Sequence, residues 1–281
     1  MSEPGRLGLV SGGGDLPGAV LRACEAAGRP VFIVALKGFT EPDLRADAGV
    51  EVGLAEFGKC IAALQKAGCR QVCFCGNVSR PDFASLVPDL KGMSVLPGLI
   101  AAGRQGDDAL LRAMLKVFED AGFEVVGPDA LLGRVLEPGA LGGVIPDKAQ
   151  LEDVTKALDV ARATGALDIG QGAVVAEGLV LAVEAQEGTD AMLRRVAGLP
   201  QALRGQAGAR KGALAKAPKP IQERRVDLPV IGVRTVELAA EAGLAGVAGE
   251  AGGLIVVDAD AVRAAADRLG LFVWGEAPSP G

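Results

Sequence analysis

Basic side chains are concentrated in residues 204–225 of a chain that is acidic overall. They are Arg204, Arg210, Lys211, Lys216, Lys219, Arg224 and Arg225. Since the 281-residue chain has a formal charge of −6, this local excess of positive charge predicts an anion-binding site, with a plain solvated face as the alternative. Asp227 lies two residues after Arg225, in the stretch QERRVDLPVIG. Phosphoryl transfer needs cations that neutralise phosphate oxygens and a carboxylate that positions water or a metal ion. Asp227 is therefore a candidate catalytic residue.

Two residue types that often carry catalysis do not occur in the sequence. There is no histidine and no tyrosine. This excludes Ser–His–Asp and Cys–His nucleophiles, zinc sites built on imidazole, and a tyrosine general acid. Cys73 and Cys75, in the run CRQVCFCG, match no zinc or iron–sulfur spacing and are predicted to be small buried residues on a strand. Acid–base chemistry is left to Asp, Glu, Lys, Cys or a metal-bound water.

The stretch GLVSGGGDLP is a second candidate site. Gly12, Gly13 and Gly14 follow an apolar stretch and precede a predicted helix, so bare backbone amides could approach a phosphate there. The spacing is not G-x-G-x-x-G, and the next strand ends in Lys37–Gly38 instead of an acidic residue that would hold a ribose. A phosphate loop is favoured over a dinucleotide site, with a tight turn that serves packing alone as the alternative.

The stretch CGNVSRPDF follows the third predicted strand, at the edge where open α/β sheets gather ligands. Asn77, Val78 and Ser79 are predicted to line a ligand there, and Arg80 could meet an anion. The alternative is a turn stiffened by Pro81.

The stretches DIGQG and EAQEGTD combine glycine with hydrogen-bonding side chains. From them, Gln171, Gly172, Gly188 and Thr189 are predicted to line a ligand. Glu187, together with Asp190, could hold a divalent cation. The alternative is ordinary turn and capping chemistry.

These candidates must be positioned by two different halves of the chain. Residues 1–138 alternate apolar strands with amphipathic helices, which predicts a Rossmann-like parallel sheet covered on both faces. The strands are expected at 6–11, 30–36, 71–76 and 123–132, and the helices at 16–28, 59–68 and 106–122. The Gly- and Pro-rich segment 137–148 is predicted to connect the two halves, with the domain boundary near residue 140. Residues 139–281 are predicted to form a distinct mixed α/β domain. It would contain a hairpin around Glu177–Gly178 and a strand at 212–217.

A series of motifs, in chain order, resembles the UDP-2,3-diacylglucosamine pyrophosphatases of the LpxI type, from the lipid A pathway. The motifs are GLVSGGGDLP, CGNVSRPDF, GDDALLR, DIGQGAVV, EAQEGTDAML, KGALAKAPKP and Q-x-x-R-x-DLPVIG. The resemblance implies a magnesium-dependent hydrolase that converts the nucleotide-lipid substrate to 2,3-diacylglucosamine 1-phosphate (lipid X) and UMP. Water would attack the β-phosphorus, and the site would lie between two α/β domains.

The resemblance also implies roles for particular residues. Asp227 matches the key aspartate of the family, while Glu223 stands where an aspartate is common, so which acid binds Mg²⁺ is left open. Asp227 and Glu187 are the metal candidates, and Lys211, Lys216 and Arg225 would balance the charge of the diphosphate.

The expected location is the cytosol, with transient contact to the inner membrane face. An acidic pI near 5.0 argues against nucleic-acid binding, and a homodimer is compatible with the sequence. Two alternative functions are kept: a nicotinamide- or flavin-dependent oxidoreductase, and a non-catalytic sensor of nucleotides or lipids.

Overall fold

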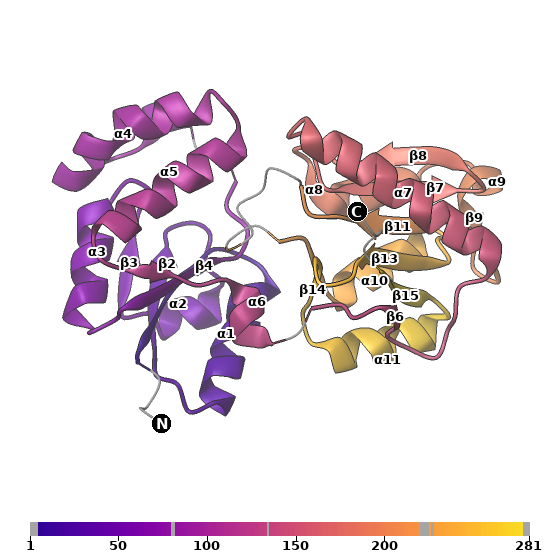
Figure 1. Ribbon diagram of the computed structural model, residues 1–281, viewed down its shortest axis with the longest axis horizontal. Coiled ribbons are helices and arrows are strands. Elements are labelled where there is room, and N and C mark those ends of the chain that lie inside the picture. Colours follow the sequence, from indigo (N-terminus) through magenta and orange to yellow (C-terminus); the bar gives the residue numbers. More distant parts are fainter. Residues whose placement is uncertain (1–4, 80–81, 134, 220–224, 226–227, 278–281) are drawn as a thin grey trace. The chain divides into compact units, whose positions relative to one another are not determined.

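The protein consists of two compact units, which are described separately. The computed structural model describes residues 5–79, 82–133, 135–219, 225 and 228–277. Of these, unit 1 contains 5–79, 82–133 and Arg225, and unit 2 contains 135–219 and 228–277. Both units are α/β (Figure 1). Among the described residues, no helix is long and apolar enough to cross a membrane.

Unit 1 is built on a five-stranded sheet in the order β3-β2-β1-β4-β5, with every neighbouring pair parallel. The strands are β1 (Leu7–Ser11), β2 (Val31–Leu36), β3 (Val50–Val52), β4 (Gln71–Cys75) and β5 (Glu124–Val125). The helices are α1 (Asp15–Ala26), α2 (Pro42–Ala46), α3 (Phe57–Lys66), η1 (Phe83–Ser85), α4 (Leu90–Gly103), α5 (Asp107–Asp120) and α6 (Pro128–Leu132). The strand order reverses beside β1, as in Rossmann-like folds.

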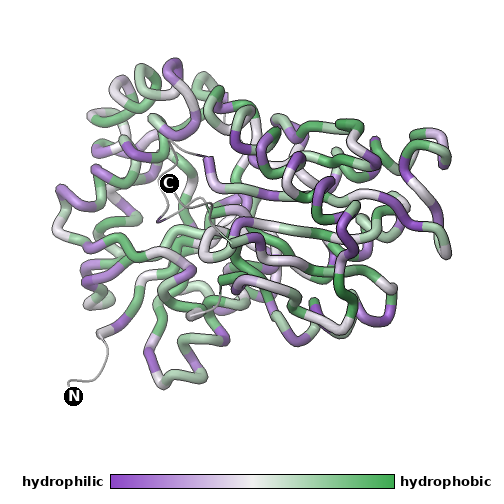
Figure 2. The backbone as a smooth tube through the Cα atoms, turned by 45° about the vertical axis from the view of Figure 1, so that its right-hand side comes forward, coloured by the Kyte–Doolittle hydropathy of each residue, from purple (hydrophilic) through white to green (hydrophobic). Residues whose placement is uncertain are grey.

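Helices cover both faces of the unit 1 sheet because side chains alternate between the faces along each strand. Leu7, Leu9 and Cys73 pack with α1, α2 and α6. Val10 and Phe74 point the other way and pack with α3, α4 and α5. Figure 1 shows these two helix layers on opposite sides of the sheet. Hydrophobic and hydrophilic stretches alternate along the chain, as expected of helices with one face on a core (Figure 2).

Unit 2 is built on a six-stranded mixed sheet in the order β6-β15-β13-β11-β7-β8, in which β11, β13 and β15 are parallel. Its strands are β6 (Gly139–Ala140), β7 (Gly172–Ala176), β8 (Leu179–Val183), β11 (Ala213–Lys216), β13 (Gly246–Glu250) and β15 (Phe272–Glu276). Two small sheets pair β9 (Gly205–Gln206) with β10 (Ala209–Arg210) and β12 (Val230–Ile231) with β14 (Ile255–Val256). The helices are α7 (Lys148–Ala166), α8 (Gly188–Ala197), α9 (Gln201–Arg204), α10 (Val233–Glu241) and α11 (Ala259–Leu269).

The unit 2 sheet is also covered on both faces. On one face α7 packs on small residues such as Ala173, Ala213 and Ala215. On the other face α8, α10 and α11 pack against Val174 and Leu214. Small side chains under α7 let a long helix lie close to the strands, so β11 is held rigidly between two layers.

Most elements predicted from the sequence are present. The parallel sheet, the 212–217 strand, and the free, buried Cys73 and Cys75 are confirmed. The hairpin is confirmed too, and both Glu177 and Gly178 have positive φ, as tight hairpin turns require. The strand predicted over 123–132 is wrong beyond Val125, because Pro128 begins α6. Strand β3 and helix α4 were not predicted from the sequence.

Candidate functional site

The glycine loop of unit 1 lies at the carboxyl ends of β1 and β4, where the strand order reverses. The Gly12 N–H donates to the Cys75 carbonyl oxygen at 2.9 Å. Gly13 and Asn77 form an isolated β-bridge, in which each N–H donates to the other residue's carbonyl oxygen, at 2.9 and 2.8 Å. The two motifs GLVSGGGDLP and CGNVSRPDF are thus brought together.

The third amide of the loop donates to a carboxylate. The Gly14 N–H, next to the N-terminus of α1, donates to Glu41 Oε1 at 3.0 Å. The expectation that Gly12, Gly13 and Gly14 present bare amides to a phosphate is therefore not met, because all three N–H groups already have acceptors. An anion at Gly14 would have to displace the Glu41 carboxylate.

The glycines have a clear packing role. A Cβ atom on Gly12 would lie 2.8 Å from the Gly76 carbonyl carbon, and one on Gly76 would lie 2.8 Å from the Gly13 oxygen and from Pro17 Cγ. Gly76 also has φ +97. Two backbone loops approach too closely here for any side chain, which is the role that the sequence analysis gave as the alternative.

Two further helix N-termini at this edge are capped by one carboxylate. Asp89 Oδ1 accepts from the Gly92 N–H of α4 at 2.7 Å, and Oδ2 accepts from the Lys59 N–H of α3 at 2.8 Å. A carboxylate at a helix N-terminus is stabilised by the unpaired N–H groups and the helix dipole. Asp89 therefore fixes α4 to α3 and fills two positions that could otherwise attract an anion.

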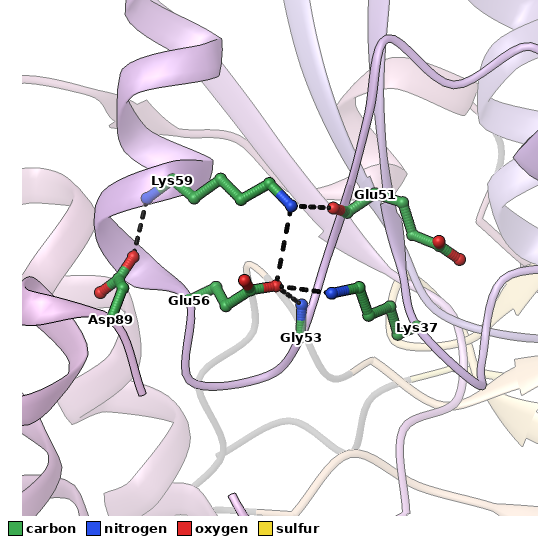
Figure 3. A network of polar contacts seen from close by, with 6 residues as sticks. All are labelled: Lys37, Glu51, Gly53, Glu56, Lys59 and Asp89. Atoms are coloured by element: carbon green, nitrogen blue, oxygen red, sulfur yellow. Dashed lines mark hydrogen bonds and ion pairs between the residues drawn. The ribbon is translucent and has the colours of Figure 1, made fainter. Parts of the chain in front are cut away.

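The Glu56 carboxylate likewise accepts a hydrogen bond from a backbone amide, in the loop after β3 (Figure 3). Its Oε2 accepts from the Gly53 N–H at 2.6 Å and from Lys37 Nζ at 3.0 Å, and lies 3.9 Å from Lys59 Nζ. Lys59 Nζ also donates to the Glu51 carbonyl oxygen at 2.8 Å. The Gly53 amide, followed by Lys37, lowers the pKa of Glu56 below its ordinary value. This edge of unit 1 thus pairs its amides and cations with its own carboxylates.

At one edge of the unit 2 sheet, three predicted motifs meet: DIGQG, EAQEGTD and KGALAKAPKP. Lys216 at the carboxyl end of β11 is in register with Gly172 at the start of β7. The Gly172 carbonyl oxygen accepts from the Glu184 N–H just after β8, at 2.8 Å. Thr189 lies in the first turn of α8, whose N-terminus receives no hydrogen bond from a side-chain cap.

Side chains at this edge form a buried polar chain of opposite charges. Lys216 Nζ donates to Thr189 Oγ1 at 2.8 Å, and Thr189 Oγ1 donates to Glu184 Oε1 at 2.7 Å. Lys216 is 4% exposed and Glu184 is 6% exposed. Burying charges costs several kcal/mol per ion unless they are well paired. Among the described residues this cation and this anion are joined only through a hydroxyl, so stability explains their burial poorly.

Among the described residues, the hydrogen-bonded row Lys216–Thr189–Glu184 has unused hydrogen-bonding capacity at both of its ends. An ammonium has three N–H donors, and beyond Thr189 the described acceptor of Lys216 is the Val230 carbonyl oxygen, at a long 3.4 Å. Glu184 Oε2 is buried and accepts no hydrogen bond from any described residue. Together, a buried ammonium, an uncapped helix N-terminus and an open carboxylate oxygen can bind a group that carries both negative charge and a hydrogen-bond donor.

Paired charges surround this edge. Lys219 Nζ lies 2.8 Å from Asp168 Oδ1, and Arg162 donates to Glu250 Oε2, at the end of β13, at 3.0 and 3.2 Å. These cations have acceptors within the unit.

Other predicted site residues are placed elsewhere or are already engaged. Lys211 precedes β11, at the opposite end of that strand from Lys216, and lies 2.9 Å from a Glu177 carboxylate oxygen at the hairpin turn. The structure therefore does not bring the two lysines together. Glu187 is 2.7 Å from Arg195, whose guanidinium holds the pKa of the Glu187 carboxyl below its ordinary value. A metal ion at Glu187 would compete with that ion pair.

The remaining candidates are split between unit 1 and the undescribed positions. Val78 and Ser79 are exposed just after the Asn77 bridge. Arg225 belongs to unit 1, where it lies 2.6 Å from Glu119 of α5. Asp227, Glu223 and Arg80 lie outside the described residues. Gly188 lies at the start of α8 and its N–H donates to the Ala185 carbonyl oxygen at 3.1 Å. Gln171 precedes β7, and its carbonyl oxygen accepts from the Ala217 N–H at 3.0 Å.

Within the described part of the chain, no group of three or more Cys, Asp or Glu side chains is arranged to hold a metal ion. Sequence reasoning missed Glu184, although one signal was available. It is two residues after Ala182, which is buried, so the two side chains share the inner face of their strand.

Comparison with known proteins identifies both halves of the chain. A model of the LpxI N-terminal domain matches residues 6–135, and a model of the LpxI C-terminal domain matches residues 137–274. The chain is 61% identical over 274 residues to the UDP-2,3-diacylglucosamine pyrophosphatase LpxI of Caulobacter vibrioides, which covers 97% of this chain and 98% of that protein.

Similarity to solved structures is weak. The UDP-glucose 4-epimerase of Thermus thermophilus, in complex with NAD, aligns with a TM-score of 0.30 and 14% identity, over 98% of this chain and 88% of that one. An isoflavone reductase aligns with a TM-score of 0.28 and 12% identity, over 98% and 79% of the two chains. Scores this low support no argument about function.

Proposed function

Because the chain belongs to the LpxI family, we propose that it hydrolyses UDP-2,3-diacylglucosamine in lipid A biosynthesis. The products would be 2,3-diacylglucosamine 1-phosphate (lipid X) and UMP. The observation that carries this proposal is 61% identity over 97% of the chain to a pyrophosphatase with that substrate in its name. The match extends over both domains.

The polar edge of unit 2 supports a diphosphate substrate. Hydrolysis of a phosphoanhydride places extra negative charge on the phosphate oxygens in the transition state, and fixed cations in a dry site stabilise that charge. Lys216 is a buried ammonium with an N–H to spare beside the N-terminus of α8. We assign the Lys216 ammonium, the backbone of Thr189 in the first turn of α8, and Gly172 to the diphosphate, with Gln171 and Gly188 beside them.

The same proposal covers the attacking water. Without histidine or tyrosine, a carboxylate is the natural group to orient it, and Asp227 in Q-x-x-R-x-D-L-P is our candidate. Water attack on the β-phosphorus would leave the new oxygen on the lipid phosphate and release UMP. Glu223 is the second acid of this segment, and both positions lie outside the described residues.

A Mg²⁺ requirement is part of the proposal, and it rests on family resemblance. The described residues offer no three-ligand cluster, and Glu187 is paired with Arg195. This donor set does not make a metal site by itself, so we derive no step through the ion. When bound, Mg²⁺ neutralises phosphate oxygens, and it commonly uses one or two carboxylates together with the substrate's own phosphates.

An assay for UMP release tests the proposal. Asp227→Ala is expected to remain folded and bind substrate but to turn over at least ~10²-fold more slowly, as for loss of a central catalytic group. Wild-type protein with EDTA should lose activity and regain it with Mg²⁺. Turnover near that of the wild type in Asp227→Ala would reject the role of Asp227, and absence of UMP from wild-type protein would reject the function and favour a non-catalytic sensor.

The oxidoreductase alternative is not favoured, because the amides of Gly12, Gly13 and Gly14 that would hold a dinucleotide are engaged within unit 1. Action at the cytosolic face of the inner membrane is part of the same proposal, because the two acyl chains of the proposed substrate would hold it in a membrane. Membrane contact and a homodimer stay predictions.

A further inference from the structure

We propose that Glu184 is a positioning residue that acts through Thr189 to hold the Lys216 ammonium at the substrate diphosphate. This inference rests on the proposed function and adds to it a residue for which the sequence motifs suggested no role. Among the described residues, Lys216 has no direct ion pair with a carboxylate. Its ammonium must therefore be held in place by another contact.

The geometry sets the direction of each hydrogen bond. A hydroxyl has one proton, and Thr189 uses it toward Glu184 Oε1 at 2.7 Å. The lone pairs of Thr189 Oγ1 are then aimed at Lys216 Nζ, 2.8 Å away. The carboxylate thus determines the orientation of the hydroxyl, and the hydroxyl determines where the ammonium sits.

The backbone holds Glu184 firmly for this role. Its N–H donates to the Gly172 carbonyl oxygen at 2.8 Å, and a Cβ on Gly172 would lie 2.6 Å from Glu184 Oε2. With Glu184 in this position, a side chain at 172 would force the carboxylate to move. The DIGQG motif is therefore explained in part by the space that Glu184 needs, in addition to any contact with the ligand.

A second buried carboxylate in the same unit shows what a structural role looks like. Asp153 is 6% exposed, as is Glu184, but its two oxygens accept from the Glu177 and Gly178 N–H groups at 2.9 and 2.7 Å. Asp153 is fully satisfied and closes the hairpin turn. Glu184 leaves Oε2 without a described donor, an arrangement that costs stability and is therefore retained for another reason.

A double-mutant cycle separates positioning from folding. Glu184→Gln keeps the shape of the side chain and removes its charge, and it is expected to lower kcat/KM for UMP release by ~10-fold. Lys216→Met is expected to lower it by ~10²–10³-fold, the size seen when a single oxyanion donor is removed. If Glu184 acts only through Lys216, the double variant should match Lys216→Met within ~2-fold.

Two variants keep this test interpretable. Thr189→Val cuts the hydroxyl link at nearly constant volume, should reproduce the loss of Glu184→Gln, and should not add to it. Asp153→Asn is the matched control, since it alters an equally buried carboxylate: it should lower the unfolding temperature and leave kcat/KM unchanged. If the Glu184→Gln and Lys216→Met effects multiply, or if Glu184→Gln and Thr189→Val lower only stability, the proposal is overturned.

Titration of the same proteins with UDP provides a readout that does not depend on turnover. UDP should bind wild-type protein, bind Glu184→Gln and Lys216→Met more weakly, and show the same lack of additivity. Coupled UDP binding without UMP release would keep this inference and reject the proposed hydrolysis. UMP release with equal UDP affinity in the wild type, the two single variants of the cycle and the double variant would reject this inference and keep the proposed hydrolysis.

Discussion

The two sheet edges that carry the glycine-rich motifs differ in how they use their charges. In unit 1, amides that face the edge meet the protein's own carboxylates: Glu41 at Gly14, Glu56 at Gly53, and Asp89 at the helices that follow. In unit 2, the N-terminus of α8 has no side-chain cap, and buried Lys216 and Glu184 each keep hydrogen-bonding capacity. We call the first edge closed, because its amides are paired with its own carboxylates, and the second open, because among the described residues part of its hydrogen-bonding capacity is unused.

This difference shows that glycine after a strand does not by itself identify a phosphate site. The GGG loop of unit 1 allows Gly12 and Gly76 to pass within contact of each other, which is a packing function. The more informative feature is a buried charge whose partners leave part of its capacity unused, because such a charge lowers stability and needs another explanation.

The largest effect should come from the open edge. Lys216→Met is expected to lower kcat/KM by ~10²–10³-fold. It should also lower the unfolding temperature, because the buried Glu184 carboxylate then has no cation nearby, so activity is compared well below that temperature. Steady-state UMP release and thermal unfolding measure the two quantities. Lys156→Met, on the exposed face of α7, is the control. Activity of Lys216→Met within threefold of the wild type would mean that the two edges do not differ as described.

A substitution at the closed edge of unit 1 should lower the free energy of unfolding. Gly76→Ala places a Cβ 2.8 Å from backbone atoms at φ +97, and we expect a loss of ~2–4 kcal/mol in the free energy of unfolding. Urea unfolding followed by far-UV circular dichroism measures it. Gly28→Ala is the matched control, since it has φ +66 with no atom within 4 Å, and it should cost only ~1 kcal/mol. Equal losses for the two variants would show that the loops do not depend on close approach.

The smallest effect concerns pH. The pKa of Glu56 is lowered by the Gly53 amide and then by Lys37, so its contribution to stability is present above its ordinary value of 4.5 and is lost as pH falls through the lowered value. Glu56→Gln should therefore be less stable than the wild type by up to ~1 kcal/mol at pH 7, and the difference should shrink as pH falls below 4.5. Unfolding curves at several pH values test this. A difference that grows toward low pH would contradict the assigned contacts.

Much of the fold could be predicted from periodicity. The alternation of strand and helix in the first half, the hairpin at Glu177–Gly178 and the β11 strand follow from local sequence. Helix α4 could not be predicted, since Gly92 and Pro97 interrupt it and its apolar residues follow no single stripe. Its start depends on Asp89, a capping residue shared with α3 that only the tertiary structure reveals.

The site was predictable in part. Local motifs indicated Gly172, Thr189 and Lys216 as candidate site residues, and the structure places these three residues together. Counting basic residues also grouped Lys211 with Lys216, and this failed because a strand places its two ends far apart. Glu184 was missed because a glutamate at a strand end usually points to solvent, and its burial depends on the β7 register.

We propose that the protein hydrolyses the phosphoanhydride by attack of water on the β-phosphorus. Isotope labelling tests this most directly. The wild-type protein would be incubated with UDP-2,3-diacylglucosamine in H₂¹⁸O, and both products analysed by mass spectrometry. We predict one ¹⁸O atom in the phosphate of 2,3-diacylglucosamine 1-phosphate and none in UMP. Label in UMP would place the attack on the α-phosphorus, and unchanged substrate would contradict the account altogether.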